Sequence, residues 1–314
     1  MTKQWRIALL LGVAMAISII ISACSSGSTG SGGSTPTASA PSTLGTPGSY
    51  NCVSGTLTVS GSTALQPLVT KVAADYTSKC TSASITVSGG GSSTGKANVE
   101  AGSSGIGDSD TPASATQADL VDHQVAVVIF GVIVNSDTNV TNLTTAQIQG
   151  IYSGTYTNWN QVGGANLPIV VVSRPTTSGT RATFAQYVLG KTETVSGPSH
   201  LISDATGTVV TEVGQTNGAI GYAATGQVPS GGAVSIISID GNAANATNVE
   251  SNAYKFWNIE HMYTKGQPTA LAQALIDYMD SDQAHTEEAT LQFVSLSAMQ
   301  STAITAHNAV PKPS

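Results

Sequence analysis

The chain has 314 residues, and its 18 acidic and 11 basic side chains give a formal net charge of −7 at pH 7. An acidic chain is a poor partner for nucleic acid, because the nucleic-acid phosphate backbone attracts Lys and Arg. The five histidines are scattered without the spacing of metal ligands, so no metal site is predicted.

Residues 1–23 have the pattern of an export signal, in which Lys3 and Arg6 precede an apolar run that extends to Ala23. The segment ISAC, which ends at Cys24, resembles a bacterial lipobox, where cleavage leaves the cysteine as the lipidated first residue. We therefore expect a signal peptide over 1–23 and a lipid at Cys24 that holds the protein on the membrane surface. A plain transmembrane anchor is the alternative.

Residues 24–50 start with this cysteine and continue almost wholly in Ser, Gly, Thr, Pro and Ala, so a flexible tether is predicted. The remaining residues, about 264, suit two lobes. Without Lys3 and Arg6 the formal charge is −9, from nine basic and 18 acidic residues. Such a chain can attract an anion only through local dipoles and a few placed cations.

The first half of the folded region alternates short buried strands with amphipathic helices. The predicted strands lie at 57–59, 85–87 and 106–107, and the predicted helices at 65–76, 96–101 and 112–120. Cys52 comes just before the first strand and Cys80 just after the first helix. Because an exported chain permits a disulfide, these two cysteines are a possible pair that would add roughly 3 kcal/mol to stability.

The second half contains a β-rich run at 125–134, which is long enough to leave one lobe and enter the other. The strand predicted at 219–223 is a candidate for the return crossing. Further strands are predicted at 169–172, 234–239 and 256–262, and further helices at 145–152, 178–189, 269–279 and 284–299.

Alternating strands and helices indicate an α/β fold with mostly parallel sheets. We expect two lobes joined by a two-strand hinge, with residues 51–129 and 224–314 in lobe I and residues 130–223 in lobe II. Ligands of such folds bind beyond the carboxyl ends of the strands, which here places the ligand between the lobes.

The loop GGGSSTGK at 89–96 nearly matches a phosphate-binding P-loop, but Ala97 stands where a Ser or Thr is needed for magnesium. The same loop matches the esterase pattern G-x-S-x-G through Gly91, Ser93 and Gly95. A hydrolase with Ser93 as nucleophile is an alternative, although only about two strands precede this loop. A glycine turn without a ligand is the other alternative.

Two further loops offer hydrogen-bond donors near helix starts, GSTALQP at 61–67 and SRPTTSGTR at 173–181. In the second loop, the guanidinium of Arg174 has a fork of donors that suits an oxyanion, and Ser178 opens the following helix. Together the three loops predict a site for a phosphate-like anion.

Asp108 and Asp110 follow the strand at 106–107, where an ionised carboxylate would repel an anion. Hydrogen phosphate carries a proton that a carboxylate can accept, whereas sulfate does not, so a buried Asp would select phosphate over sulfate. An ordinary turn role is the alternative for each Asp.

Seven segments resemble, in the same order, the phosphate-binding proteins of bacterial ABC phosphate importers, and the similarity extends over most of residues 54–300. They are GSTALQPL, GGGSSTGKANV, GIGDSD, TTAQIQGIYSGTYTNWNQVGG, VVSRPTTSGTRATF, GAIGY and YTKGQP. The resemblance implies a monomeric type II periplasmic-binding-protein fold that closes on one inorganic phosphate. It also implies delivery to permease and ATPase subunits in the membrane, without catalysis or a cofactor.

By position within these motifs, the resemblance assigns the phosphate contacts to eight residues: Thr63, Ala64, Ser92, Asp110, Arg174, Ser178, Gly179 and Thr180. Some relatives have an aromatic residue in place of Ala64, an acidic residue in place of Thr176 and a small residue in place of Asp108. These departures bear on affinity more than on the ligand itself. The remaining alternatives are a binding protein or sensor for another tetrahedral oxyanion.

Overall fold

The computed structural model describes residues 50–194 and 200–313. The predicted signal peptide, the lipidation site at Cys24 and all but the last residue of the predicted tether lie outside the described residues. Within the described ranges, no helix has both the length and the apolar character that crossing a membrane requires.

Strands and helices alternate along most, but not all, of the described chain. The first half contains β1 (Gly55–Gly61), α1 (Gln66–Lys79), β2 (Ala83–Ser88), α2 (Ser92–Glu100), β3 (Ile106–Ser109), β4 (Leu120–Asn135), β5 (Asn142–Leu143), α3 (Thr145–Tyr152), β6 (Val170–Ser173) and α4 (Gly179–Phe184), which continues into a π-helical turn (Ala185–Leu189). The second half contains β7 (His200–Ile202), α5 (Thr206–Gln215), β8 (Ala219–Ala224), β9 (Val234–Ile239), α6 (Ala246–Glu250), β10 (Trp257–Lys265), α7 (Ala270–Tyr278), α8 (Asp282–Thr290), β11 (Phe293–Val294) and α9 (Ser301–Asn308).

The described strands pair in the order β2-β1-β3-β10-β4-β8-β6-β7, with β9 and β11 also paired to β4, and β5 to β9. The outer pairs are parallel: β1 with β2 and β3, and β6 with β7 and β8. The central strands β4 and β10 are antiparallel to their neighbours. The sheet is therefore mixed, with a parallel group at each end.

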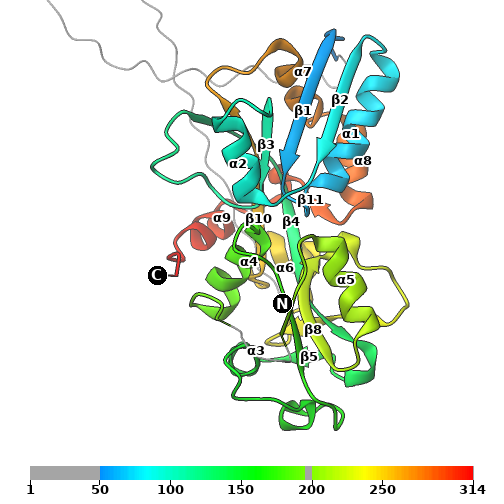
Figure 1. Ribbon diagram of the computed structural model, residues 1–314, viewed down its shortest axis with the longest axis vertical. Helices are drawn as coiled ribbons and strands as arrows, with labels where there is room; N and C mark the ends of the chain where they lie inside the picture. Colours follow the sequence, from blue (N-terminus) through cyan, green and yellow to red (C-terminus); the bar gives the residue numbers. More distant parts are fainter. Residues whose placement is uncertain (1–49, 195–199, 314) are drawn as a thin grey trace, which may run out of the picture. The chain divides into compact units, whose positions relative to one another are not determined.

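β4 connects the two parallel groups, as Figure 1 shows. Its first part, residues 120–129, pairs with β10, and residues 130–134 pair with β8. We call the parallel group around β1 to β3 lobe I and the parallel group around β6 to β8 lobe II. The boundaries of the lobes stay a prediction, and β9 pairs with the part of β4 that enters lobe II.

Two predicted helices differ from the structure. Residues 112–119 form no helix, because two backbone groups at the start of this segment bond to side chains of other elements. The carbonyl of Pro112 accepts from Lys96 Nζ (3.3 Å), and the amide of Ala113 donates to Tyr263 OH (2.9 Å). The helix predicted over 284–299 ends at Thr290, where Gln292 adopts a left-handed φ of 58° and the chain enters β11. The elements that were not predicted are β5, β7, β11, α5, α6 and α9.

The core forms where the sequence pattern places it. α1 buries Leu68, Val69, Val72 and Tyr76 at helical spacing. Cys52 forms a disulfide with Cys80 across the first βαβ unit, and their Cα atoms are 5.1 Å apart. Aromatic rings then fix the position of α4. Phe184 stacks on Tyr222 of β8 at 4.4 Å between ring centroids, an arrangement that typically adds about 1 kcal/mol beyond burial.

Candidate anion-binding site

The three loops that the sequence singles out follow the carboxyl ends of strands. Because β1, β2 and β3 are parallel, Ser62, Gly89 and Asp110 leave the sheet at the same edge. The loop after β6 comes from lobe II and reaches the same place. All eight residues that the resemblance assigns to phosphate are buried.

The loops of the two lobes are in direct contact. The amide of Ser93 donates to the carbonyl of Thr177 at 3.1 Å. A Cβ atom on Gly179 would lie 2.2 Å from Ser92 Oγ and 2.9 Å from Asp110 Cβ, so no larger residue fits at this position without displacing its neighbours. The structure thus brings the lobe I and lobe II parts of the predicted site together.

Asp110 receives hydrogen bonds from both lobes. Its Oδ1 accepts from the hydroxyl of Ser62, and its Oδ2 accepts from Thr180 Oγ1 at 2.9 Å. Its backbone amide donates to Ser92 Oγ at 3.0 Å, and its carbonyl accepts from Asn258 Nδ2 at 2.7 Å. Each oxygen of this carboxyl thus accepts one hydroxyl hydrogen bond and keeps a lone pair free for a further donor.

Arg174 is 1 % exposed and is held by neutral groups. Its Nη2 donates to Thr63 Oγ1 and to the carbonyl of Asp204, both at 3.1 Å, and its Nη1 donates to Thr206 Oγ1 at 3.3 Å. No described carboxylate forms an ion pair with it, and its Nε has no partner among the described residues. Burial lowers the pKa of Arg174, while the charge of Asp110 acts in the opposite direction. A buried cation of this kind suits an anionic ligand.

The remaining predicted contacts lie at the starts of α1, α2 and α4. Ser178 caps α4 by accepting from the amide of Arg181 at 3.2 Å, which places Gly179 and Thr180 in the first turn. The amide of Ala64 donates to Ser62 Oγ at 3.1 Å. Unlike this amide, those of Gly179 and Thr180 lie in the first turn of α4, where an amide has no partner inside the helix and is available to an anion.

Thr206 and Asp204 were not predicted. Thr176, at the place where some relatives have an acid, is exposed, and the groups that hold Arg174 come instead from the start of α5. No sequence motif marks these two residues. Arg181 has a different role from Arg174, since its Nη2 donates to the carbonyl of Glu193 at 2.9 Å and secures the loop.

Lys96 and Ser93, which suggested a P-loop and an esterase, lie outside the group of contacts around Asp110 and Arg174. Lys96 Nζ bonds to Ser109 Oγ at 3.1 Å and to Thr111 Oγ1 at 3.0 Å, and burial lowers its pKa to about 8. It therefore supports the end of β3. Ser93 is exposed, and no described histidine is hydrogen-bonded to it.

Asp108 is buried next to the site, and neither of its carboxyl oxygens has a partner among the described residues. Burial raises the pKa of Asp108 well above its ordinary value, and the charge of Asp110 adds to this effect. Asp108 thus favours its neutral form, which leaves Asp110 as the carboxylate that faces the loops.

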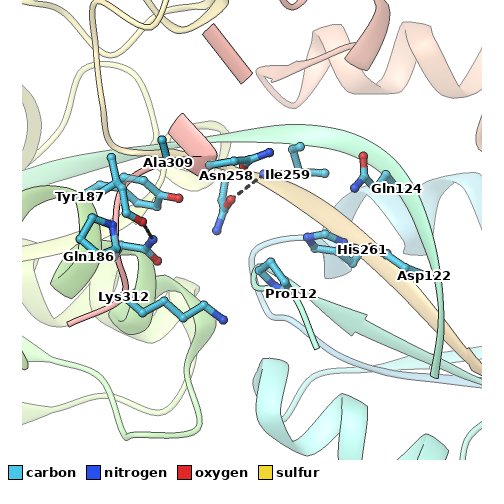
Figure 2. Close-up of a pocket in the computed structure, with 13 residues that line it drawn as sticks. Pro112, Asp122, Gln124, Gln186, Tyr187, Asn258, Ile259, His261, Ala309 and Lys312 are labelled. Carbon is cyan, nitrogen blue, oxygen red and sulfur yellow. Dashed lines mark hydrogen bonds and ion pairs between the residues drawn. The ribbon is translucent and has the colours of Figure 1, made fainter. Parts of the chain in front are cut away.

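A cavity of about 420 Å³ lies next to this site. Figure 2 shows Lys312, Gln186 and Tyr187 on one side of it and His261, Gln124 and Pro112 on the other, with Asn258 between them. Asn258 links the cavity to the site through its bond to Asp110. None of the eight predicted phosphate contacts lines the cavity, so it is separate from the anion site.

Comparison with known proteins agrees with this geometry. Residues 46–283 match the model of the PBP superfamily domain. The chain is 37% identical over 233 residues to the phosphate-binding protein PstS of Bacillus subtilis, which covers 73% of this chain and 76% of the relative. The structure is similar to that of a Clostridium perfringens protein that was solved with bound phosphate and is described as a phosphate ABC transporter substrate-binding protein. The TM-score is 0.73 and the identity 31%, over 77% of this chain and 100% of that one. An ABC-type phosphate transport receptor from Vibrio cholerae gives a TM-score of 0.62 at 26% identity, over 76% of this chain and 99% of that one.

Proposed function

Because the chain belongs to the PBP superfamily of periplasmic binding proteins, we propose that it binds inorganic phosphate between its lobes and delivers it to an ABC phosphate importer. One observation carries this proposal. Arg174 is buried without an ion pair to a carboxylate, and the buried Asp110 belongs to the same group of contacts. The names of the relatives support the same ligand. The protein acts as a transport receptor and performs no chemistry on the phosphate.

The roles of the residues follow from their chemistry. Arg174 supplies the positive charge, and the hydroxyls of the site together with the first-turn amides of the helices supply neutral donors. Asp110 accepts the hydrogen of hydrogen phosphate. Sulfate has no such hydrogen, so its oxygen would face the carboxylate without a proton between them, and this repulsion rejects it.

We place the receptor outside the cytoplasm, in keeping with its relatives. A lipid at Cys24, followed by the segment up to residue 50, would hold the receptor, as a monomer, on the membrane surface near the permease of the importer and its ATPase subunits. The sequence pattern of residues 1–24 supports this anchor. Mass spectrometry of the protein from membranes would detect the acyl chains on Cys24.

Titration calorimetry on protein stripped of ligand tests the proposal. Wild-type protein should bind phosphate in excess sulfate, and Asp110→Asn should lower the ratio of phosphate to sulfate affinity at least tenfold, since the amide can donate to sulfate. Asp119→Asn is the matched control, because this side chain is exposed and its backbone carbonyl bonds to the amide of Gly266, outside the site. Stripped wild-type protein that binds no phosphate would contradict the proposal.

A further inference from the structure

A second carboxyl group lies directly beside Asp110 on the neighbouring strand. β10 pairs antiparallel with β3, with His261 opposite Ser109 and Met262 opposite Asp108. Continuing this register places Glu260 opposite Asp110. Opposite residues of an antiparallel pair share one face of the sheet, and their Cβ atoms lie about 5 Å apart.

Glu260 is fully buried, and no described group donates a hydrogen bond to either of its carboxyl oxygens. The carboxyl of Asp110 is within hydrogen-bonding reach of it. Two ionised carboxylates would repel each other in this position, so the contact is favourable only when one of them carries a proton.

The surroundings decide which of the two holds the proton. Asp110 receives two hydroxyl bonds and lies near the cations Lys96 of α2 and Arg174 of lobe II. Glu260 has only carboxyls as charged neighbours, Asp110 and Asp108, and on β4 it faces the apolar Ala126. Burial raises the pKa of Glu260 well above its ordinary value, and the charge of Asp110 adds to this effect.

We propose that Glu260 is a positioning residue that stays protonated and donates a hydrogen bond to Asp110. This inference rests on the proposed function. This bond orients the Asp110 carboxylate and stabilises its charge, which leaves a lone pair for the hydrogen of phosphate. Selectivity for a protonated oxyanion then depends on two acids, one ionised and one neutral. Ionisation of Glu260 would place a second negative charge beside the ligand and weaken binding.

Glu260→Gln and Glu260→Leu separate the hydrogen bond from the charge. The amide of Gln donates as the protonated acid does, whereas Leu cannot donate. At pH 7 we expect Glu260→Gln to bind phosphate within threefold of wild type and Glu260→Leu to bind at least tenfold more weakly by calorimetry. As the pH rises, wild type should lose more affinity than Glu260→Gln, because only wild type can ionise at this position.

Glu288→Gln is the matched control. Glu288 is also a buried acid without a partner among the described residues, and burial raises its pKa to about 8, but it lies on α8, outside the site. It should leave phosphate affinity and its pH profile unchanged. Thermal unfolding would verify that each variant folds. If Glu260→Leu does not fold, the comparison of wild type with Glu260→Gln still tests whether Glu260 is protonated.

Two results would overturn the inference. Phosphate binding more than tenfold tighter in Glu260→Gln at pH 7 would mean that wild-type Glu260 is ionised. The absence of a protonated-carboxyl stretch in the infrared difference spectrum of wild type minus Glu260→Gln would mean the same, and this measurement needs no phosphate. The spectrum therefore tests Glu260 even where calorimetry contradicts the proposed function.

Discussion

Arg174 differs from most buried arginines in having hydroxyl and carbonyl partners in place of a carboxylate. Neutral acceptors fix the orientation of the guanidinium without neutralising its charge, so the full charge remains available to a ligand. Thr206 has a central part in this arrangement, because its hydroxyl contacts both Arg174 and Thr63 Oγ1, the latter at 3.0 Å. A hydroxyl at the start of α5 thus joins the cation of lobe II to a loop of lobe I.

Thr206→Val should weaken phosphate binding about tenfold, because it removes this hydroxyl and keeps the branched shape. Hydrogen bonds to charged groups contribute about 1.5–3 kcal/mol, and the partial loss expected here corresponds to the lower end of that range. Calorimetry at constant ionic strength measures the change. Thr211→Val is the control, since Thr211 is exposed on the same helix and bonds only to the carbonyl of Gly207. Equal affinities of the two variants would refute the role given to Thr206.

The contact between α2 and α4 depends on the missing side chain of Gly179. A methyl group there would meet Ser92 of the opposite lobe at less than the closest distance that real Cβ atoms reach. The two loops would have to separate, and the donors of the two lobes would no longer converge on one ligand. The first turn of α4 would remain intact, because Ala is a good helix former.

Gly179→Ala should therefore lower phosphate affinity at least a hundredfold while leaving the lobes folded. Titration calorimetry gives the affinity, and circular dichroism gives the fold. Gly207→Ala is the matched control, because a Cβ at this position on α5 has only one neighbouring atom, at 4.0 Å. That control should bind as wild type does and gain up to about 1 kcal/mol of stability from helix propensity. Normal phosphate binding by Gly179→Ala would contradict the close approach of the loops.

Local signals account for the elements that were predicted correctly. α1, α3 and β6 have clear periodicity or apolar runs, and loops of Gly and hydroxyl residues separate them from their neighbours. α5 carries a mixed signal: Val209, Val210 and Val213 recur at helical spacing, but Thr206–Gln215 also contains two glycines and several β-branched residues, which disfavour a helix. It forms because Val209 and Val213 pack against β8, a contact that its own sequence does not reveal.

The residues of the candidate site also fall into a group with a local sequence signal and a group without one. The eight predicted residues occupy short motifs, so the sequence places them near one another once parallel strands are assumed. Glu260 reaches the site only because β10, which comes late in the chain, lies between β3 and β4. Thr206 reaches it because α5 packs against β8 and β6. No periodicity determines which strand lies next to which, and both residues were therefore missed.

The C-terminal helix α9 connects the two lobes through one ring. His307 stacks against Tyr187, which follows α4 in lobe II, at 3.7 Å between ring centroids. Its other face stacks against Trp257 of β10 at 3.6 Å. Burial lowers the pKa of His307 to about 3, and the nearby charge of Lys255 acts in the same direction. The ring is therefore neutral in the folded protein at every pH near neutrality.

This neutral ring should make stability depend on pH. In the unfolded chain a histidine titrates near pH 6.5, so below that pH the unfolded state binds one proton more than the folded state, and the free energy of unfolding falls as the pH falls toward 3. The loss between pH 7.5 and pH 5 should be about 2 kcal/mol, since each pKa unit corresponds to about 1.4 kcal/mol. His307→Phe keeps an aromatic ring between Tyr187 and Trp257 and removes the titrating group.

Urea unfolding at pH 7.5 and pH 5 tests this expectation. The difference in unfolding free energy between wild type and His307→Phe should shift by about 2 kcal/mol in favour of the variant at the lower pH. His285→Phe is the control, because His285 is partly exposed on α8 and lies outside the stack of Tyr187 and Trp257. Parallel stability curves for wild type and His307→Phe would mean that His307 can take up a proton in the folded state, and that its contact with both lobes is looser than the stacking distances indicate.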